Sequence, residues 1–367
     1  MKIAALEPYA ALSHVAFLED LKSHSGHEIV LRTLPARYWK WRMRTASMHF
    51  AKQLAQDEPY DILLLSDYVN GAELKALLPP HQQGAAMVVY FHENQLSYPL
   101  QEGERRDVHH GLTHFHSILA STRSVFNSNY HLESFFRELE ALVQRIPDMN
   151  LRPEVERARQ LSQVLPIGTE LDCNPPRVEP LRRPPVLLWS HRWEYDKDPL
   201  RFLEAAVGLM EHGVDFRIRL LGQRFQEEPE GLEALRRKLE PRILQVGFVG
   251  DREAYLEALR TSDIVVSTAR HEFFGIGTLE ALRSGCLPLL PNDLAYPELL
   301  ASFEGSERFL YEPASDLSVA LKASIEAVVH GRWAWERETL VRETDRFHWK
   351  NLAPLYDRLF EDVHHRR

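Results

Sequence analysis

The segment 264–282, IVVSTARHEFFGIGTLEAL, indicates the fold most directly. A short apolar run is followed by a loop containing Gly275 and Gly277, and then by a helical pattern. Strand, loop and helix in this order form the repeating unit of a parallel α/β sheet. Open sheets of this kind bind ligands at the carboxyl ends of their strands. We therefore expect the residues directly after this strand to lie at a ligand site.

The same unit recurs along the chain. Short apolar runs occupy 3–6, 28–31, 62–65, 87–91, 124–126 and 164–165, and then 186–189, 216–221, 243–246, 264–266 and 287–290. Runs this short and this continuously apolar predict parallel strands buried on both faces. Two such series predict an α/β protein of two doubly wound, Rossmann-like domains that face a central cleft. We expect an N-terminal domain at 1–172 and a C-terminal domain at 185–335.

Two further segments complete this organisation. The stretch 173–184 is rich in proline, which suits a stiff linker and no regular element. The last segment, 336–367, is aromatic with amphipathic spacing, so it must pack on another part of the chain. We expect it to be a helix that crosses back to the N-terminal domain.

Composition excludes several classes of protein. The 367 residues are 44% hydrophobic and 26% charged, an average globular composition. No run approaches the roughly 18 apolar residues of a membrane-spanning helix, and the N-terminus is unlike a signal peptide. Two cysteines cannot form a disulfide framework, which favours a reducing, cytoplasmic location. The net charge of −9 argues against a globally basic nucleic-acid binder but permits a local basic patch.

The loop and helix after residue 266 carry two candidate carboxylates, Glu272 in the loop and Glu280 in the first helical turns. The glycines allow a ligand to approach the backbone, and the free amides of a helix start suit a phosphate. Like charge keeps both glutamates away from a diphosphate, but each can accept hydrogen bonds from sugar or ribose hydroxyls. The alternative is an ordinary glycine-containing turn with two solvated glutamates.

Cations follow the first strand of the second series. Arg192 and Lys197 lie in the segment 189–199, where an anion would bind, and the planar guanidinium of arginine matches phosphate oxygens. The alternative is a charged surface loop.

A basic and aromatic block extends from residue 32 to residue 44. It contains no acid, and tyrosine and tryptophan alternate with its arginines and lysine. Cations neutralise backbone phosphates and flat rings stack on unpaired bases, so the block suits an RNA loop. The alternative is a basic helix face whose tryptophans pack against their own domain.

Histidines form two further candidates. His92 ends an apolar run, so we expect it to reach the ligand site, although a lone histidine is more often structural. His110 and His114 have the i, i+4 spacing of metal ligands, and His109 and His116 flank them. No cysteine is near, so we favour packed histidines or a helix near the acceptor over a metal site.

These motifs together resemble known proteins. The spacing from Glu272 to Glu280 is similar to the E-x7-E motif of retaining family 4 glycosyltransferases, which have the GT-B fold. The segment 165–171, LPIGTEL, resembles the interdomain connection of that family. Four blocks resemble the tRNA-queuosine α-mannosyltransferases more narrowly, namely PARYWKWRMRT (35–45), FHENQLSYP (91–99), FNS (126–128) and HRWEYDK (191–197). They cover most of the chain in the same order.

The resemblance implies a retaining transfer of mannose from GDP-mannose to queuosine in the anticodon of a tRNA of the aspartate type, with no metal. Implied catalytic residues are His92, Glu272, Arg192 and Lys197. Implied donor-binding residues are Ser13, Phe248, Gly250, Phe274, Gly275, Ile276, Gly277 and Glu280. Implied acceptor and tRNA-binding residues are Arg37, Trp39, Lys40, Trp41, Arg42, Arg44, Asn94 and Gln95.

One departure from the family concerns the first loop, 8–14, where many members have a glycine pair and this chain has none. The donor contacts of that loop, including Ser13, are therefore open. Two alternatives to the implied function also remain open. One is a family 4 transferase with a lipid or small-molecule acceptor, and the other is a catalytically silent protein that binds nucleotide sugar or RNA.

Overall fold

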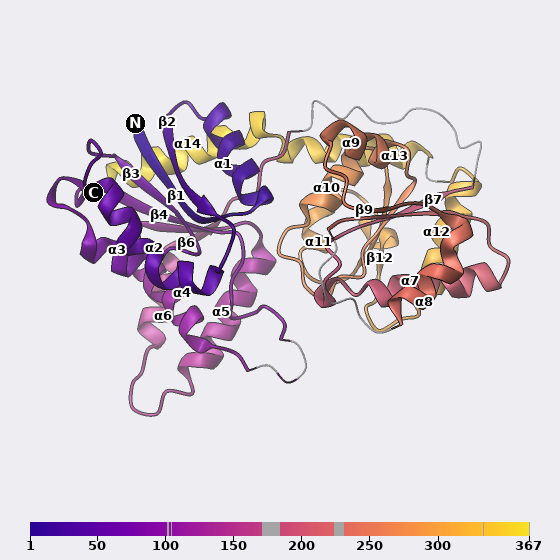
Figure 1. The fold of residues 1–367 in the computed structure, drawn as a ribbon, viewed down its shortest axis with the longest axis horizontal. Coiled ribbons are helices and arrows are strands. Elements are labelled where there is room, and N and C mark those ends of the chain that lie inside the picture. The colour runs from indigo at the N-terminus through magenta and orange to yellow at the C-terminus, as the bar shows by residue number, and fades with distance from the viewer. Residues whose placement is uncertain (101–102, 104, 171–183, 224–230, 333, 367) are drawn as a thin grey trace. The chain divides into compact units, whose positions relative to one another are not determined.

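The computed structural model describes every residue except 101–102, 104, 171–183, 224–230, 333 and 367. The chain forms two compact units, one of Met1–Glu170 with Phe347–Arg367 and one of Leu171–Arg346 (Figure 1). The expected linker at 173–184 lies almost wholly outside the described residues. None of the described helices combines the length and the apolar composition that crossing a bilayer requires.

The first unit contains β1 (Lys2–Ala10), α1 (Leu12–His24), β2 (Glu28–Pro35), α2 (Trp39–Leu54), β3 (Ile62–Ser66), α3 (Gly71–Leu77), η1 (Pro80–Gln82), β4 (Ala86–Phe91), α4 (Val108–Ala120), β5 (Arg123–Phe126), α5 (Asn129–Val143), α6 (Arg152–Gln160), β6 (Ser162–Val164) and α14 (Trp349–His365). Its six strands form one sheet in the order β2-β1-β3-β4-β5-β6. All neighbours pair in parallel, as the sequence predicts.

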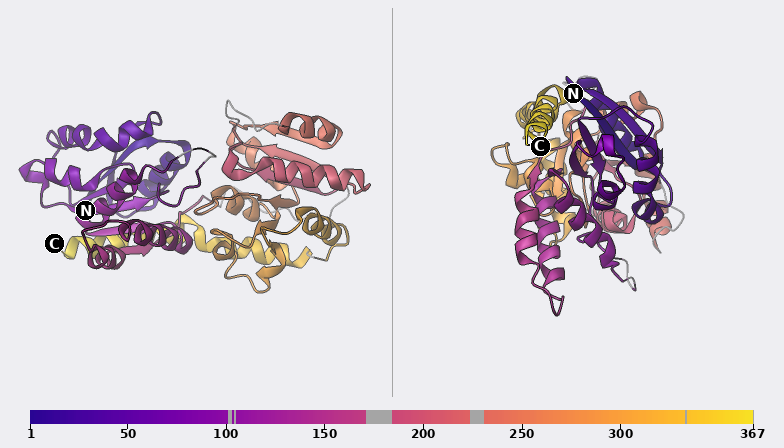
Figure 2. Two further views of the ribbon diagram at one scale, coloured as in Figure 1. Left: turned by 90° about the horizontal axis from the view of Figure 1, so that it is seen from below. Right: turned by 90° about the vertical axis from the view of Figure 1, so that its left-hand side faces the viewer.

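Helices cover both faces of this sheet because the strand side chains alternate between two apolar layers. Leu63 and Leu65 belong to the large buried cluster beneath α2–α6. On the other face, the Tyr90 ring lies 4.5 Å from Phe17 of α1 and 6.1 Å from Tyr356 of α14. Both views of Figure 2 show α14 beside the N-terminal strands. The last helix is therefore part of the first unit's core.

The second unit contains β7 (Val186–Ser190), η2 (Tyr195–Lys197), α7 (Pro199–Glu211), β8 (Arg217–Leu221), α8 (Leu232–Leu239), η3 (Glu240–Arg242), β9 (Ile243–Gly247), α9 (Arg252–Arg260), β10 (Ile264–Val266), α10 (Ile276–Arg283), β11 (Leu287–Pro291), α11 (Tyr296–Leu299), η4 (Ser306–Phe309), β12 (Leu310–Tyr311), α12 (Leu317–Val329), α13 (Ala334–Glu343) and η5 (Thr344–Phe347). Its sheet has the order β12-β11-β10-β7-β8-β9. Every pair in it is parallel.

The structure corrects three expectations. The strands β2, β6 and β9 lie at sheet edges and are largely half-exposed, so they are not buried on both faces. The two-residue strand β12 was not predicted, because its apolar run, 309–311, is very short. The segment 336–367 is not one helix, since α13 ends at Glu343 and α14 begins at Trp349. Between them, Thr169 and His348 form an isolated parallel bridge.

Gly168 provides a test of how α14 packs. A Cβ on Gly168 would lie 2.3 Å from the Trp349 ring, whereas a Cβ on Gly84 would meet nothing within 4 Å. Trp349 is fully buried, so it has no room to move aside. We expect Gly168→Ala to destabilise the first unit by about 1–3 kcal/mol. Calorimetry should show a lower melting temperature for Gly168→Ala and no change for Gly84→Ala. Equal melting temperatures of Gly168→Ala and the wild type would contradict this packing.

Candidate functional site

Each sheet has one point where the strand order reverses, and several of the predicted site residues follow the strands beside it. In the first sheet β1 and β3 are neighbours, with β2 on one side and β4–β6 on the other. In the second sheet β7 and β10 are neighbours, with β8 and β9 on one side and β11 and β12 on the other. Ligands of doubly wound sheets bind in the crevice at such reversals.

The loop after β10 holds the two glutamates as the sequence predicts. Glu272 lies in the loop, and Glu280 lies within α10, which begins at Ile276. Gly275 caps α10 with a φ of +91°, a conformation that suits glycine. A Cβ on Gly277 would lie 3.4 Å from the carbonyl oxygen of Ser190, so the end of β7 lies against the start of α10. Phe274 is 6% exposed, and its backbone N–H donates to Glu272 Oε1 at 3.4 Å.

Lys197 connects the two loops through a buried cluster of charges. Its Nζ lies 3.2 Å from Asp196 Oδ2 and 3.4 Å from Glu272 Oε2, and it donates to the carbonyl of His271. Burial opposes the charge of Lys197, but Glu272 and Asp196 still raise its pKa. Burial also opposes the charge of Glu272, but Lys197 and the neighbouring histidines lower its pKa to about 2. Both groups are therefore charged at neutral pH.

Hydrogen bonds of Thr268 hold these loops in place. The hydroxyl of Thr268 accepts from Trp189 Nε1 at 3.0 Å and lies 2.9 Å from the carbonyl oxygens of both Lys197 and Asp198. Arg270 pairs with Asp198 at 2.6 Å, and Asp198 has a φ of +47°. The ends of β7 and β10 are thus fixed relative to each other before any ligand binds.

The other predicted donor residues are more exposed. The Arg192 side chain is 54% exposed and lies 3.2 Å from Glu194. Phe248, in the loop after β9, is 60% exposed, and Gly250 of the same loop is also exposed. The two oxygens of Glu280 are bound by Arg252, at 2.6 Å, and by the hydroxyl of Tyr255, at 3.1 Å. A ribose at Glu280 must therefore share that carboxylate with Arg252 or displace it.

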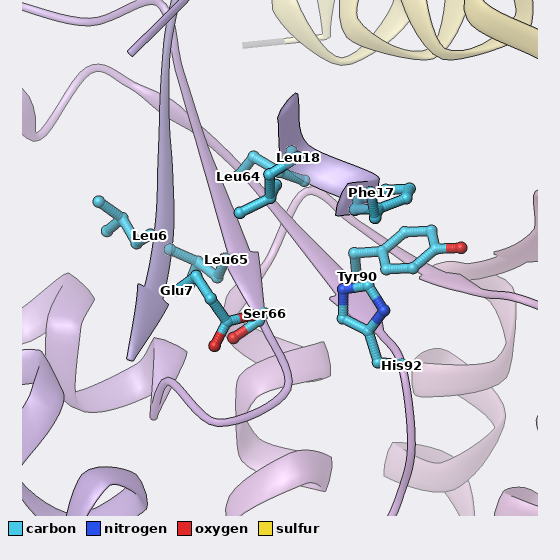
Figure 3. A pocket seen from close by; sticks show the side chains of 9 residues that line it. All are labelled: Leu6, Glu7, Phe17, Leu18, Leu64, Leu65, Ser66, Tyr90 and His92. Carbon is cyan, nitrogen blue, oxygen red and sulfur yellow. The ribbon is translucent and has the colours of Figure 1, made fainter. Parts of the chain in front are cut away.

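In the first unit, His92 and Glu7 line the same small pocket (Figure 3). The carboxylate of Glu7 accepts from Tyr9 N at 2.7 Å and lies 2.9 Å from His14 Nδ1. Burial opposes the charge of His14, but Glu7 raises the pKa of His14 to about 9. The His92 ring stacks on the His14 ring at 4.0 Å. Burial and the charges of His14 and His131 lower the pKa of His92 well below its usual value, so His92 is neutral.

Glu7, His14 and His92 are also the residues closest to a metal-ligand arrangement within the described part of the chain. Their donor atoms lie within 4.8 Å of one another. However, the imidazole of His14 already bonds to Glu7, and the two rings stack face to face rather than converging on one point. This arrangement suits an ion pair better than a metal centre.

The predicted acceptor residues of the loop after β4 differ in accessibility. Asn94 is completely buried, and its side chain bonds Leu96 N and Ser97 N, so it shapes the loop. The Gln95 side chain is half-buried and donates to Glu93 Oε1 at 3.0 Å. Ser13, in the first turn of α1, is exposed.

The basic and aromatic block opens α2. Tyr38 and Trp41 are each 72% exposed, while Trp39 is half-buried, with its ring 5.1 Å from His110. The alternative in which both tryptophans pack against their own domain is therefore wrong for Trp41. Tyr38 adopts a φ of +55°, which is unusual for a bulky side chain and typical of a functional loop.

The cations of this block are all at least partly exposed. The side chains of Arg37, Lys40 and Arg44 are exposed, and that of Arg42 is half-buried. Lys40 Nζ lies 5.4 Å from the centre of the Trp39 ring, within the range of a cation–π contact. These side chains therefore form an accessible cationic surface around the start of α2.

In α4, His110 and His114 are packed, whereas His109 and His116 are exposed. His110 is 6% and His114 is 1% exposed. Burial, reinforced by the charge of His110, lowers the pKa of His114 to about 3. A neutral histidine against Phe91, at 5.3 Å, is a core residue. Of the two interpretations offered by the sequence, the structure favours packed histidines.

Sequence reasoning missed several charged residues at both strand-order reversals. In the first unit these are Glu7, His14, Asp67 and Glu93, and in the second they are Asp196 and Arg252. Asp67 directly follows β3, and Glu93 lies two residues after β4, so their positions after strands were the available signal.

Comparisons with known proteins agree with this geometry. Residues 2–169 match the family described as tRNA-queuosine alpha-mannosyltransferase N-terminal, and residues 176–343 match glycosyl transferases group 1. The solved structure of a sucrose-phosphate synthase from Thermosynechococcus elongatus is similar over 100% of both chains, with a TM-score of 0.73 and 14% identity. A glycosyltransferase from Rickettsia africae gives a TM-score of 0.69 at 13% identity, over 99% of this chain and 98% of that one. The GT-B fold is therefore confirmed.

Two relatives are informative in sequence. A GDP-mannose-dependent alpha-(1-6)-phosphatidylinositol dimannoside mannosyltransferase of Mycobacterium tuberculosis is 25% identical over 216 residues, 55% of this chain and 53% of that protein. The tRNA-queuosine alpha-mannosyltransferase of Drosophila melanogaster is 36% identical over 310 residues, 81% of each chain. With this identity over most of both sequences, the chain belongs to the tRNA-queuosine alpha-mannosyltransferase family of glycosyltransferases.

Proposed function

We propose that this protein transfers mannose from GDP-mannose to queuosine in a tRNA anticodon, with retention at the anomeric carbon. The observation that carries the proposal is the similarity to the Drosophila enzyme over 81% of the chain. The GDP-mannose dependence of the mycobacterial relative supports the donor. A tRNA substrate and the small number of cysteines agree with a cytoplasmic reaction.

The second unit is the donor side of this proposal. The charge of Lys197 is already offset by Asp196 and Glu272, so we assign Lys197 to the orientation of Glu272. Glu272, ionised and fixed in this way, accepts hydrogen bonds from sugar hydroxyls. Arg192 and the free amides at the start of α10 then stabilise the charge that develops on the leaving diphosphate.

The first unit is the acceptor side. The exposed rings and cations at the start of α2 suit an RNA loop, since they offer both stacking and phosphate contacts. His92 is neutral, so its imidazole can hydrogen-bond a hydroxyl without adding charge. We assign no covalent nucleophile. Retention then follows from attack on the face that the diphosphate leaves, with a phosphate oxygen taking the proton of the acceptor hydroxyl.

The decisive experiment incubates the protein with GDP-mannose and tRNA that carries or lacks queuosine. We expect the mass of one hexose to appear on the queuosine nucleoside alone, and equally in the presence of EDTA, because the residues assigned here need no metal. UDP-sugars serve as donor controls. Transfer to a lipid or to a free small molecule, or GDP binding without any transfer, would refute the proposal.

The charge cluster of the second unit predicts the effects of two variants. Lys197→Met leaves two carboxylates without their buried cation, and Arg192→Ala removes an exposed guanidinium from the diphosphate. We expect kcat to fall about 10²- to 10³-fold in each. Lys238→Met, which changes a lysine 59% exposed on α8, is the matched control. Because Arg192 is exposed, its variant should keep the wild-type melting temperature. Unchanged turnover in that variant would remove Arg192 from the mechanism.

The exposed ring of Trp41 predicts an effect on RNA binding. Trp41→Ala should leave the melting temperature unchanged, because the side chain is 72% exposed. It should raise the dissociation constant for tRNA about tenfold at constant salt, because base stacking on an aromatic ring contributes roughly 1–3 kcal/mol. Leu77→Ala, which changes a residue 45% exposed on α3, serves as the control. Equal tRNA affinity of wild type and Trp41→Ala would exclude Trp41 from the RNA surface.

A further inference from the structure

Three carboxylates gather at one edge of the first sheet. Glu7 belongs to β1, Asp67 directly follows β3, and Glu93 follows β4. These three strands are neighbours in the sheet, and their carboxyl ends meet at the same edge. Their negative charges act on one another, because burial and the charge of Glu93 raise the pKa of Asp67 well above its usual value.

The compensation of this charge is incomplete within the residues that the structure describes. Glu7 pairs with His14 at 2.9 Å, and no comparable ion pair holds Asp67 or Glu93. Asp67 is 2% exposed. Its Oδ1 accepts from the backbone N–H of His92 at 3.1 Å, while its Oδ2 is buried without a hydrogen-bond partner. A carboxylate oxygen buried in this way is costly, because it has lost the hydrogen bonds that water would donate.

Two hydrogen bonds hold Glu93 in a fixed orientation. The hydroxyl of Tyr68 and the side-chain amide of Gln95 both donate to Glu93 Oε1. Two donors on one oxygen fix the plane of the carboxylate and leave Oε2 as its remaining acceptor. The Glu93 side chain is half-buried, so it is accessible where Asp67 is not.

This acidic edge lies beside the cationic start of α2. The Tyr68 ring is 6.2 Å from Trp39 and 5.3 Å from Tyr9, and Lys40 Nζ lies 5.4 Å from the centre of the Trp39 ring. Clustered carboxylates next to a surface that attracts RNA phosphates weaken that attraction, because like charges repel. The unmodified nucleobases of RNA carry no positive charge that would explain the cluster. A cationic substituent on the base would explain it.

We propose that Glu93, with Asp67 behind it, binds a protonated amine of the acceptor nucleoside. This inference rests on the proposed function, in which the acceptor is queuosine, whose side chain joins an aliphatic secondary amine to its hydroxyls. A charged hydrogen bond from the amine to Glu93 Oε2 holds that side chain in place and thereby positions its hydroxyls for transfer. The same contact lets the protein distinguish the modified base from unmodified guanine by its charge rather than by its size.

The test compares the affinity of the protein for tRNA that carries queuosine with its affinity for the same tRNA without it. Wild type should prefer the modified tRNA by about tenfold or more, in line with a charged hydrogen bond. Glu93→Gln keeps the shape and an oxygen for Tyr68 but removes the charge. It should lose this preference while binding unmodified tRNA as well as wild type does. Asp67→Asn should reduce the preference in the same direction.

The control is Glu28→Gln, which removes one exposed carboxylate at the opposite, amino-terminal end of β2 and should keep the full preference. A wild type without any preference, or a Glu93→Gln variant that keeps the preference, would overturn the inference. A variant whose affinity for both tRNAs falls equally would also overturn the inference, since Glu93 would then only support the fold. The proposed function is judged separately, because it fails only when wild type transfers no mannose to queuosine.

Discussion

The buried ammonium of Lys197 is the interaction on which the second unit's site depends. It lies between the carboxylates of Asp196 and Glu272, and these come from the loops that follow two neighbouring strands, β7 and β10. Removing Lys197 would leave two buried carboxylates without their cation, which is strongly unfavourable. The cluster therefore fixes the loops, and the loops fix the start of α10. Orientation of Glu272 and exposure of the α10 amides are consequences of the same contact.

The first unit also contains a buried ion pair, but its cation is an imidazolium instead of an ammonium. Its ion pair joins Glu7 to His14, and the imidazolium in turn stacks on a neutral histidine, His92. The difference suits the two roles proposed for the units. A diphosphate requires strong, permanent cations and amides, whereas a hydroxyl acceptor requires a neutral partner and fixed geometry. Both clusters lie where the strand order reverses, so their positions follow from the topology of the sheets.

The fold was largely predictable because apolar runs such as 62–65 and 87–91 are local signals that need no knowledge of the rest of the chain. The edge strands β2 and β9 show the limit, since exposure depends on the position of a strand in the sheet. The E-x7-E spacing is local as well, and it placed Glu272 and Glu280 correctly relative to α10. Contacts such as His14 on His92, or Tyr68 with Glu93, join residues far apart in sequence, so only the strand order reveals them. Asp196 looked like part of a charged surface loop, because burial of a charge leaves no mark on composition.

The return of α14 to the first unit has a consequence for how the protein is made. Trp349, Tyr356 and Phe360 are buried there, against residues that the ribosome adds more than three hundred positions earlier. During synthesis, the apolar face around Phe17 is not covered by α14 until the entire second unit has been translated. Apolar surface exposed for that long invites self-association or chaperone binding. The nascent first unit thus becomes complete only after the second unit has been synthesised.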